Sequence, residues 1–295
     1  MVVADQGELR IRVLHLSLLV PQLELANDFQ PVTHESVGTT NCHILERLSI
    51  EVLHSYMIEF SSVHFRLYDQ ILSPTHVSFN NIAPVEISIR WKHVTWVEAP
   101  CIQIYDALDI LQMAPQLQHF KFGPHDDDDF YDDETIMITH KSLKSLDLTN
   151  LSPETFLNCI KCPALEELSI SMSYYDDPLY LENFLKRSKC SLASFTHLPY
   201  GDAIAVVPVL RFTPSITHLS LQGCGIPDKF LEAFMETTAA GGNTEFLPHL
   251  RSFTCTVSFE GFQWSKIPSM THRSHHEKDM VSWPLSKIKI SEWHG

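Results

Sequence analysis

The amino-acid sequence predicts an α/β fold of the solenoid type, in which short parallel strands alternate with helices along a right-handed superhelix. Three observations predict it: a recurring pattern of apolar residues, the spacing between its copies, and prolines that keep a constant phase to the pattern. Right-handed crossovers place all helices on one side of a parallel sheet. We therefore expect a curved parallel sheet on the concave face and helices on the convex face.

The apolar pattern has apolar residues at the first, fourth and sixth positions of a short segment. In Leu143-Lys-Ser-Leu-Asp-Leu-Thr and Ile216-Thr-His-Leu-Ser-Leu-Gln the intervening residues are polar. Such alternation is typical of a strand with one buried face. Clear copies are Ile11/Leu14/Leu16, Leu45/Leu48/Ile50, Leu117/Phe120/Phe122, Leu143/Leu146/Leu148, Leu165/Leu168/Ile170, Ile216/Leu219/Leu221, Leu250/Phe253/Cys255 and Leu285/Ile288/Ile290. Weaker copies are Trp91/Val94/Trp96 and Leu192/Phe195/His197, and Val77/Phe79 is a candidate for a degenerate copy.

The copies recur at nearly constant intervals. From Val94 the middle apolar positions fall at residues 94, 120, 146, 168, 195 and 219, in steps of 26, 26, 22, 27 and 24 residues. Steps of about 20–29 residues are typical of leucine-rich repeats. We expect helices between the strands, over residues 105–114, 153–161, 178–189 and 227–238. The step of 46 residues from Leu48 to Val94 leaves either a degenerate unit or a long insertion within residues 17–90.

A proline stands two residues before the first apolar position in four copies, at Pro115, Pro163, Pro214 and Pro248. Proline there would end the preceding helix and hold the chain extended as it enters the strand. This agreement of phase across unrelated local sequence supports the register of these four strands.

Segments 113–120, 161–170 and 212–221 resemble the leucine-rich repeats of F-box proteins, most closely those of mushroom-forming fungi. The stretch Trp91-Lys-His-Val-Thr-Trp is similar to their mid-domain units, and the resemblance covers about residues 40–295. We expect a single leucine-rich-repeat domain over residues 1–295, with irregular repeats over 1–90, regular repeats over 91–225 and long-loop repeats over 226–295.

The resemblance implies a protein-interaction module, the substrate-recognition region of an F-box-type ubiquitin-ligase adaptor. The F-box itself has no counterpart in this sequence, which opens almost at once on a strand pattern. A repeat array needs a polar cap at each end, so we expect a missing N-terminal part. A Skp1-type adaptor would be reached only through that part. The alternatives are a stand-alone scaffold or inhibitor and, third, a metal-binding protein or enzyme.

Composition narrows the classes of partner. The 295 residues are 44% hydrophobic, and 36 Asp and Glu against 21 Lys and Arg give a formal charge of −15. This balance disfavours nucleic acid or an anionic membrane as the main partner. Seven scattered cysteines, mostly among apolar residues, indicate reduced core thiols. With no secretory signal or membrane span, we expect an intracellular protein, cytoplasmic or nuclear.

Three groups of residues have the composition of a metal or redox site. The acidic run Asp126–Glu134 offers hard-cation ligands, Cys159-x-x-Cys162 resembles half a zinc site, and His272, His275 and His276 could bind a transition metal. A solvated loop, buried core thiols and a polar loop, respectively, are the favoured interpretations. No nucleophile elbow or phosphate-binding glycine loop is present. We therefore expect no catalytic residues, metal or cofactor.

The residues that alternate with the buried ones would form a strip on the concave face, where a protein or peptide would bind. The candidate partner-binding residues are Arg47, Glu51, His93, Thr95, His119, Lys121, Ser145, Asp147, Glu167, Ser169, His218, Ser220, Gln222, Ser252 and Thr254. Solvated strand residues of a degenerate repeat are the alternative, and the sequence leaves both interpretations open.

Overall fold

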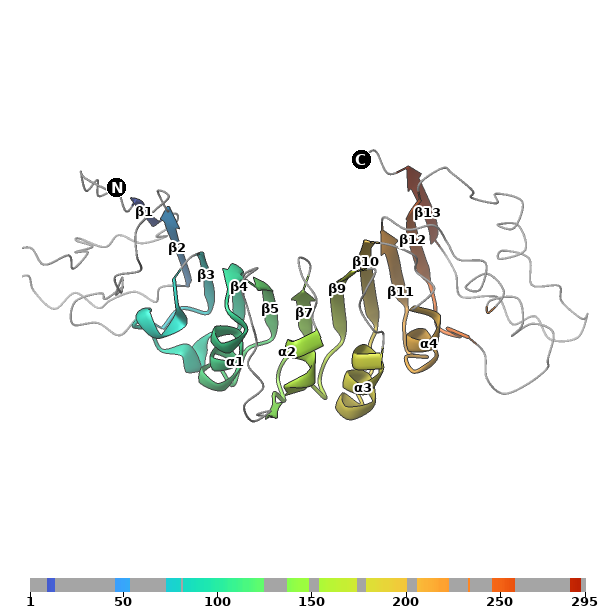
Figure 1. Cartoon of the computed structure of the whole chain (residues 1–295), viewed down its shortest axis with the longest axis horizontal. Coiled ribbons are helices and arrows are strands. Elements are labelled where there is room, and N and C mark those ends of the chain that lie inside the picture. Colours follow the sequence, from blue (N-terminus) through green and yellow to red (C-terminus); the bar gives the residue numbers. More distant parts are fainter. Residues whose placement is uncertain are drawn as a thin grey trace, which may run out of the picture. The chain divides into compact units, whose positions relative to one another are not determined.

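The structure is a computed structural model that describes residues 10–13, 46–53, 73–80, 82–124, 137–148, 154–173, 179–200, 206–222, 233, 246–257 and 287–292. The chain forms two compact units, unit 1 (Met1–Asp129) and unit 2 (Phe130–Gly295). Each is described by itself. The α/β class is confirmed: both units contain a mainly parallel sheet with few helices (Figure 1).

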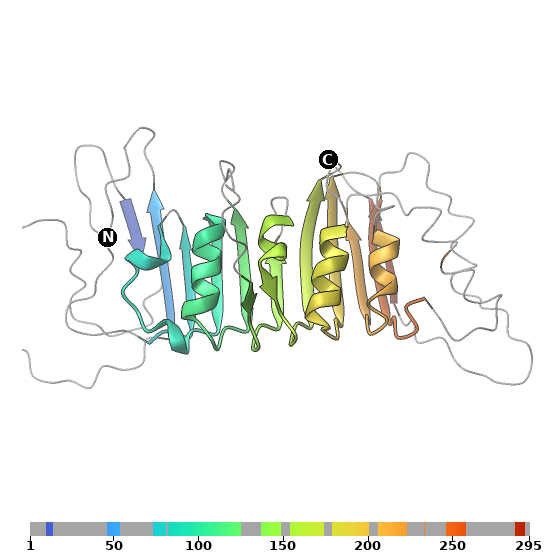
Figure 2. The ribbon, with the colours of Figure 1, turned by 60° about the horizontal axis from the view of Figure 1, so that its bottom comes forward.

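Unit 1 contains four parallel strands that are neighbours in chain order. They are β2 (Arg47–Leu53), β3 (His76–Asn80), β4 (Trp96–Ile102) and β5 (His119–Pro124). Strand β1 (Arg10–Val13) pairs with β2 in the antiparallel direction. The 3-10 helices η1 (Pro84–Glu86) and η2 (Trp91–His93) precede β4, and α1 (Ile104–Met113) follows it. Helix α1 covers one face of this sheet (Figure 2).

Unit 2 repeats this arrangement. Its parallel strands, again in chain order, are β7 (Ser145–Leu148), β9 (Glu167–Ser173), β10 (Ser194–Tyr200), β11 (His218–Gln222), β12 (Ser252–Val257) and β13 (Lys287–Glu292). Helices α2 (Glu154–Asn158), α3 (Leu179–Ser188) and α4 (Val206–Arg211) lie on one face of the sheet (Figure 2). Strands β6 (Ile138–Thr139) and β8 (Ile160–Lys161) form a separate two-stranded sheet.

One inward apolar residue of each strand pairs with the corresponding residue of the next strand. In unit 1 the row is Leu48, Val77, Val97 and Phe120. In unit 2 it is Leu146, Leu168, Phe195, Leu219, Phe253 and Ile288. Every side chain of these rows whose burial is described is at most 2% exposed. Full burial of such a side chain contributes about 1.5–3 kcal/mol, so the rows supply much of the stability of each unit. The predicted weak copy Val77/Phe79 is confirmed as a buried strand.

One backbone arrangement recurs where the strands begin. The carbonyl oxygen of Glu46 accepts hydrogen bonds from the N–H groups of Thr75 and His76, at 3.1 and 3.0 Å. In unit 2 the carbonyl of Ala193 accepts from Thr217 and His218 in the same way, at 2.8 and 3.0 Å. The other such acceptors are Thr75 and Thr95 in unit 1, and Lys144, Glu166 and Thr217 in unit 2. Each unit is thus built from one repeated local structure.

The four phased prolines lie in tight turns. The N–H of Leu117 donates to the carbonyl of Ala114 at 2.9 Å across Pro115, and Leu165 donates to Cys162 at 3.3 Å across Pro163. The same bond spans Pro214 and Pro248. The expectation that these prolines hold the chain extended was therefore wrong, because each is the second residue of a turn, where its fixed φ is favoured. The residues at both ends of the four turns are buried.

The strand predicted from Trp91/Val94/Trp96 was placed three residues too early in the sequence. Trp91 lies in η2, and Val94 N–H donates to its carbonyl oxygen at 2.9 Å, as in the proline turns. The inward residues are Val94, Val97 and Ala99, each 0% exposed. Trp96 instead points outward and is 39% exposed. The outward residues of β4 are therefore Trp96 and Glu98.

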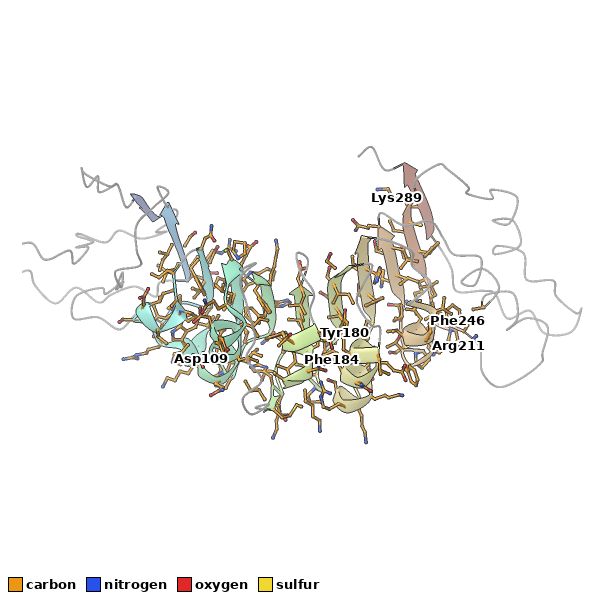
Figure 3. The ribbon with its side chains drawn as sticks, viewed as in Figure 1. Asp109, Tyr180, Phe184, Arg211, Phe246 and Lys289 are labelled. Carbon is orange, nitrogen blue, oxygen red and sulfur yellow. The ribbon has the colours of Figure 1, made fainter. Side chains whose placement is uncertain are left out.

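The helix predictions are confirmed where the structure describes them. Helices α1, α2 and α3 match the predicted segments 105–114, 153–161 and 178–189, although α1 begins one residue earlier, at Ile104, and α2 ends at Asn158. Segment 227–238 lies outside the described residues except for Ala233, which is helical and buried. Helix α4 was not predicted; at its C-terminal end the Arg211 guanidinium lies 5.7 Å above the ring of Phe246 (Figure 3).

Candidate binding surface

The outward residues of unit 1 form rows across β2 to β5, on the sheet face that the helices leave open. The first row is Arg47, His76, Trp96 and His119, and the second is Ser49, Ser78, Glu98 and Lys121. We call these eight residues the unit 1 face. The opposite side of the sheet carries the helix, as shown by exposed Asp109 of α1 (Figure 3). The first row combines a guanidinium group with three aromatic rings.

Trp96 is held between two histidine rings. The centroid of Trp96 lies 6.1 Å from that of His76 and 4.7 Å from that of His119, with interplanar angles of 24° and 30°. Because His76 and His119 lie on the strands that flank β4, one imidazole ring lies on each side of the indole. The exposed part of Trp96 is therefore its edge, which carries partial positive charge and the indole N–H.

A threonine hydroxyl contacts the ring of His76. The Thr75 hydroxyl donates to the Glu46 carbonyl oxygen at 3.2 Å, and the same Oγ1 lies 2.9 Å from His76 Nδ1. When the hydroxyl proton goes to the Glu46 carbonyl, Oγ1 accepts from Nδ1–H, and Nε2 of neutral His76 is then an acceptor. Thr217 and His218 repeat this geometry in unit 2, at 3.1 and 2.8 Å.

The charges around His76 disfavour its protonation. Burial lowers the pKa of His76 below its usual 6.5, and the nearby charges of Arg47 and His119 lower it further, against an opposing effect of Glu46. Lys121 and Glu98, in the second row, form an ion pair at 2.9 Å with both side chains about half exposed. Near neutral pH, Arg47 is thus the fixed positive charge of the first row.

The outward face of unit 2 consists largely of short side chains that carry hydroxyl groups. Ser169, Thr196, Ser220 and Thr254 form one row across β9 to β12. Acidic residues, Asp147 and Glu167, lie at the β7 and β9 end, and the basic residues Lys287 and Lys289 lie on β13. Lys289 is exposed on the face opposite the helices (Figure 3). The small side chains allow a partner to approach the strands closely.

The structure places most of the predicted strip on these outward faces. They are Arg47, His119, Lys121, Ser145, Asp147, Glu167, Ser169, His218, Ser220, Gln222, Ser252 and Thr254. Glu51 lies on β2 opposite Asn80, and its side chain is outside the described residues.

Two predicted strip residues lie elsewhere. His93 is in η2, and Thr95 precedes β4, where its hydroxyl donates to the Thr75 carbonyl oxygen at 3.2 Å. The prediction did not include His76, Trp96 or Glu98. The weak Val77/Phe79 copy already implied an outward His76, while Trp96 and Glu98 required the corrected register.

Two of the three predicted metal candidates cannot be placed on the binding surface. The acidic run Asp126–Glu134 and the histidines 272, 275 and 276 lie outside the described residues. Within the described ranges, no three His, Cys, Asp or Glu side chains gather so that they could hold a metal ion. Nor does any described helix have the length and apolar character needed to cross a membrane.

The Cys159-x-x-Cys162 pair is buried beside Arg187. Burial raises the pKa of the Cys162 thiol to about 12, with Cys190 adding to the rise and Arg187 opposing it. Burial likewise raises the pKa of Cys159, again against Arg187. Both groups are thiols near neutral pH and are poor nucleophiles in that form.

Arg187 has a structural role in this region. Its Nη2 and Nε donate to the carbonyl oxygens of Leu157 and Ile160 at 2.5 and 3.1 Å, which joins α3 to the end of α2 and to β8. Replacing Arg187 with Met should lower the free energy of unfolding by about 1–3 kcal/mol, because partly buried carbonyls lose their donors. Urea denaturation measures this, with the exposed Lys144→Met as matched control. Equal midpoints for both variants would contradict the role.

Comparison of the chain with protein-family models, with curated proteins and with solved structures found no match.

Proposed function

We propose that the chain is a leucine-rich-repeat-type solenoid that acts as a protein-interaction module. The proposed binding surface is the outward strand face of unit 1, which we have called the unit 1 face. The repeated turns, paired apolar rows and shared carbonyl acceptors within each unit support the solenoid. Its more specific form, the substrate-recognition region of an F-box-type ligase adaptor in the cytoplasm or nucleus, rests on the resemblance of the repeats.

The observation that carries the proposal is the position of Trp96. A tryptophan with 39% of its surface exposed stands in the middle of a polar strand face, fixed by stacking on both sides. A held aromatic ring loses little entropy on binding, and tryptophan and arginine are the residues most enriched at the energetic centres of interfaces. Arg47 lies in the same row. Solvated strand residues alone give no reason for this arrangement.

An unbiased peptide-display selection on the intact chain tests the proposal. Selected peptides should bind the variant Trp96→Ala at least about tenfold more weakly than the wild type, because hot-spot residues contribute about 2 kcal/mol or more. The control is Val85→Ala, which removes a 68% exposed apolar side chain of η1 and should leave affinity unchanged. Circular dichroism establishes that both variants fold. Peptides that bind both variants as well as the wild type would refute the unit 1 face as the binding surface.

A further inference from the structure

We propose that the unit 1 face binds an acidic peptide segment in extended conformation, and that binding takes up a proton. This inference rests on the proposed function and adds the chemistry of the partner. It is argued from the donors of the first row, their spacing and the tautomer of His76.

The groups that the first row offers a partner are mainly hydrogen-bond donors. Arg47 contributes a guanidinium group without an ion-pair partner among the described residues, and Trp96 contributes the positive edge of its ring with its N–H. Glu98, the acidic residue of the second row, accepts a hydrogen bond from Lys121, with 2.9 Å between Nζ and Oε1. A partner rich in carboxylate oxygens matches this set, whereas a basic partner would meet Arg47 as a like charge.

The spacing of the row suits an extended chain. Arg47 and His119 lie on strands three intervals apart, and neighbouring strands are about 4.8 Å apart, so the row is about 14 Å long. An extended peptide rises about 3.3 Å per residue, so carboxylates at every second residue over five residues span about 13 Å. Such a segment can place a carboxylate near each end of the row and one near its middle.

The tautomer of His76 couples binding to protons. In the tautomer of neutral His76 whose Nδ1–H donates to Thr75 Oγ1, Nε2 presents a lone pair that repels a carboxylate. Protonation of Nε2 converts this acceptor into a charged donor. Around His76, Arg47 and Glu46 act from β2 and the residue before it, and His119 acts from β5. A bound carboxylate would offset the effects of Arg47 and His119, so the complex should hold a proton that the free protein lacks.

Fluorescence anisotropy with a labelled Ser-Glu-Ser-Glu-Ser-Glu-Ser peptide tests the inference on the intact chain at low ionic strength. Affinity should increase by up to about fivefold from pH 7.5 to pH 6, since one exposed charge pair contributes up to about 1 kcal/mol. The same peptide with Gln in place of Glu, and one with Lys, should bind at least about tenfold more weakly. Added salt should weaken binding of the acidic peptide.

Three variants separate the roles of the row. Arg47→Gln should weaken acidic-peptide binding at both pH values, His76→Gln should reduce the gain at pH 6, and Val85→Ala should change neither. If the acidic peptide fails and the display selection returns basic or apolar sequences that depend on Trp96, the inference is wrong while the proposed function stands. If no selected peptide depends on Trp96, both fail. A single-stranded RNA that binds where the acidic peptide does not would overturn the inference in favour of a nucleic acid.

Discussion

The free energy of unfolding is expected to fall by about 3 kcal/mol as the pH is lowered from 7 to 4, because of one buried histidine. His197 of β10 is 1% exposed, and neither ring nitrogen has a hydrogen-bond partner among the residues that the structure describes. It occupies an inward position that the neighbouring strands fill with Ile170 and Leu221. The ring is thus held in an apolar layer, with Phe195 at 6.2 Å between centroids.

The direction of this effect follows from the pKa. Burial lowers the pKa of His197 from 6.5 to about 4 in the folded protein. Between these values the unfolded chain binds a proton that the folded chain excludes, so stability rises with pH in this window. The contribution is fully present above pH 6.5 and is lost progressively as the pH falls to about 4. Below that the two states bind equal numbers of protons at this site.

Two substitutions test His197. His197→Leu supplies the side-chain type of the neighbouring strands, and His197→Phe keeps a ring that does not titrate. We expect either to raise stability at pH 7 by about 1–3 kcal/mol, because buried unsatisfied nitrogens are removed. Urea denaturation at several pH values gives the difference between wild type and variant, which cancels other titrating groups. A difference that stays constant from pH 7 to pH 4 would contradict a buried neutral histidine.

Much of the sheet could be predicted from sequence, because its period-2 alternation is local. In residues 143–149 and 216–222 each apolar residue of the pattern is followed by a polar one, and the structure has strands in the expected register at Ser145–Leu148 and His218–Gln222. His197 was also expected inward from the copy Leu192/Phe195/His197. Its lack of partners could not be foreseen, since that depends on which side chains from other strands surround it.

The error at Trp91 has a definite physical cause. Buried residues at the two ends of a tight turn are three apart, as in Ala114 and Leu117. Buried residues at the start of a strand are also three apart, as in Leu117 and Phe120. Trp91, Val94 and Val97 continue both spacings without a proline to mark the turn. The strand pattern could therefore be matched three residues too early in the sequence, and this match assigned Trp96 to the core.

Short elements escaped prediction because they depend on their neighbours. Helix α4 has six residues and contains Pro208, which is tolerated because N–H groups of the first turn have no helical partner. Strands β6 and β8 have two residues each and exist only as a pair, joined through Ile138 and Ile160. Elements of two or six residues are too short to show a hydrophobic period in the sequence.

Aspartate substitutions on β4 give the largest expected difference between adjacent residues. Val97→Asp would place a carboxylate at a site that is 0% exposed, next to Val77 and Phe120. We expect destabilisation of more than about 4 kcal/mol and loss of the folded state, because an unpaired buried charge adds to the lost apolar contact. Trp96→Asp removes a stacked surface ring and should cost about 1–2 kcal/mol.

The register predicted from Trp91/Val94/Trp96 reverses this order, since it buries Trp96 and exposes Val97. Circular dichroism and urea denaturation of the two variants therefore decide between the registers. The neighbouring strand supplies a matched pair whose register is not in question: Phe120→Asp should unfold unit 1, and His119→Asp should leave it folded. If Val97→Asp behaves like His119→Asp, then Trp96 belongs to the core. The unit 1 face would then lose the aromatic residue on which the binding proposal depends.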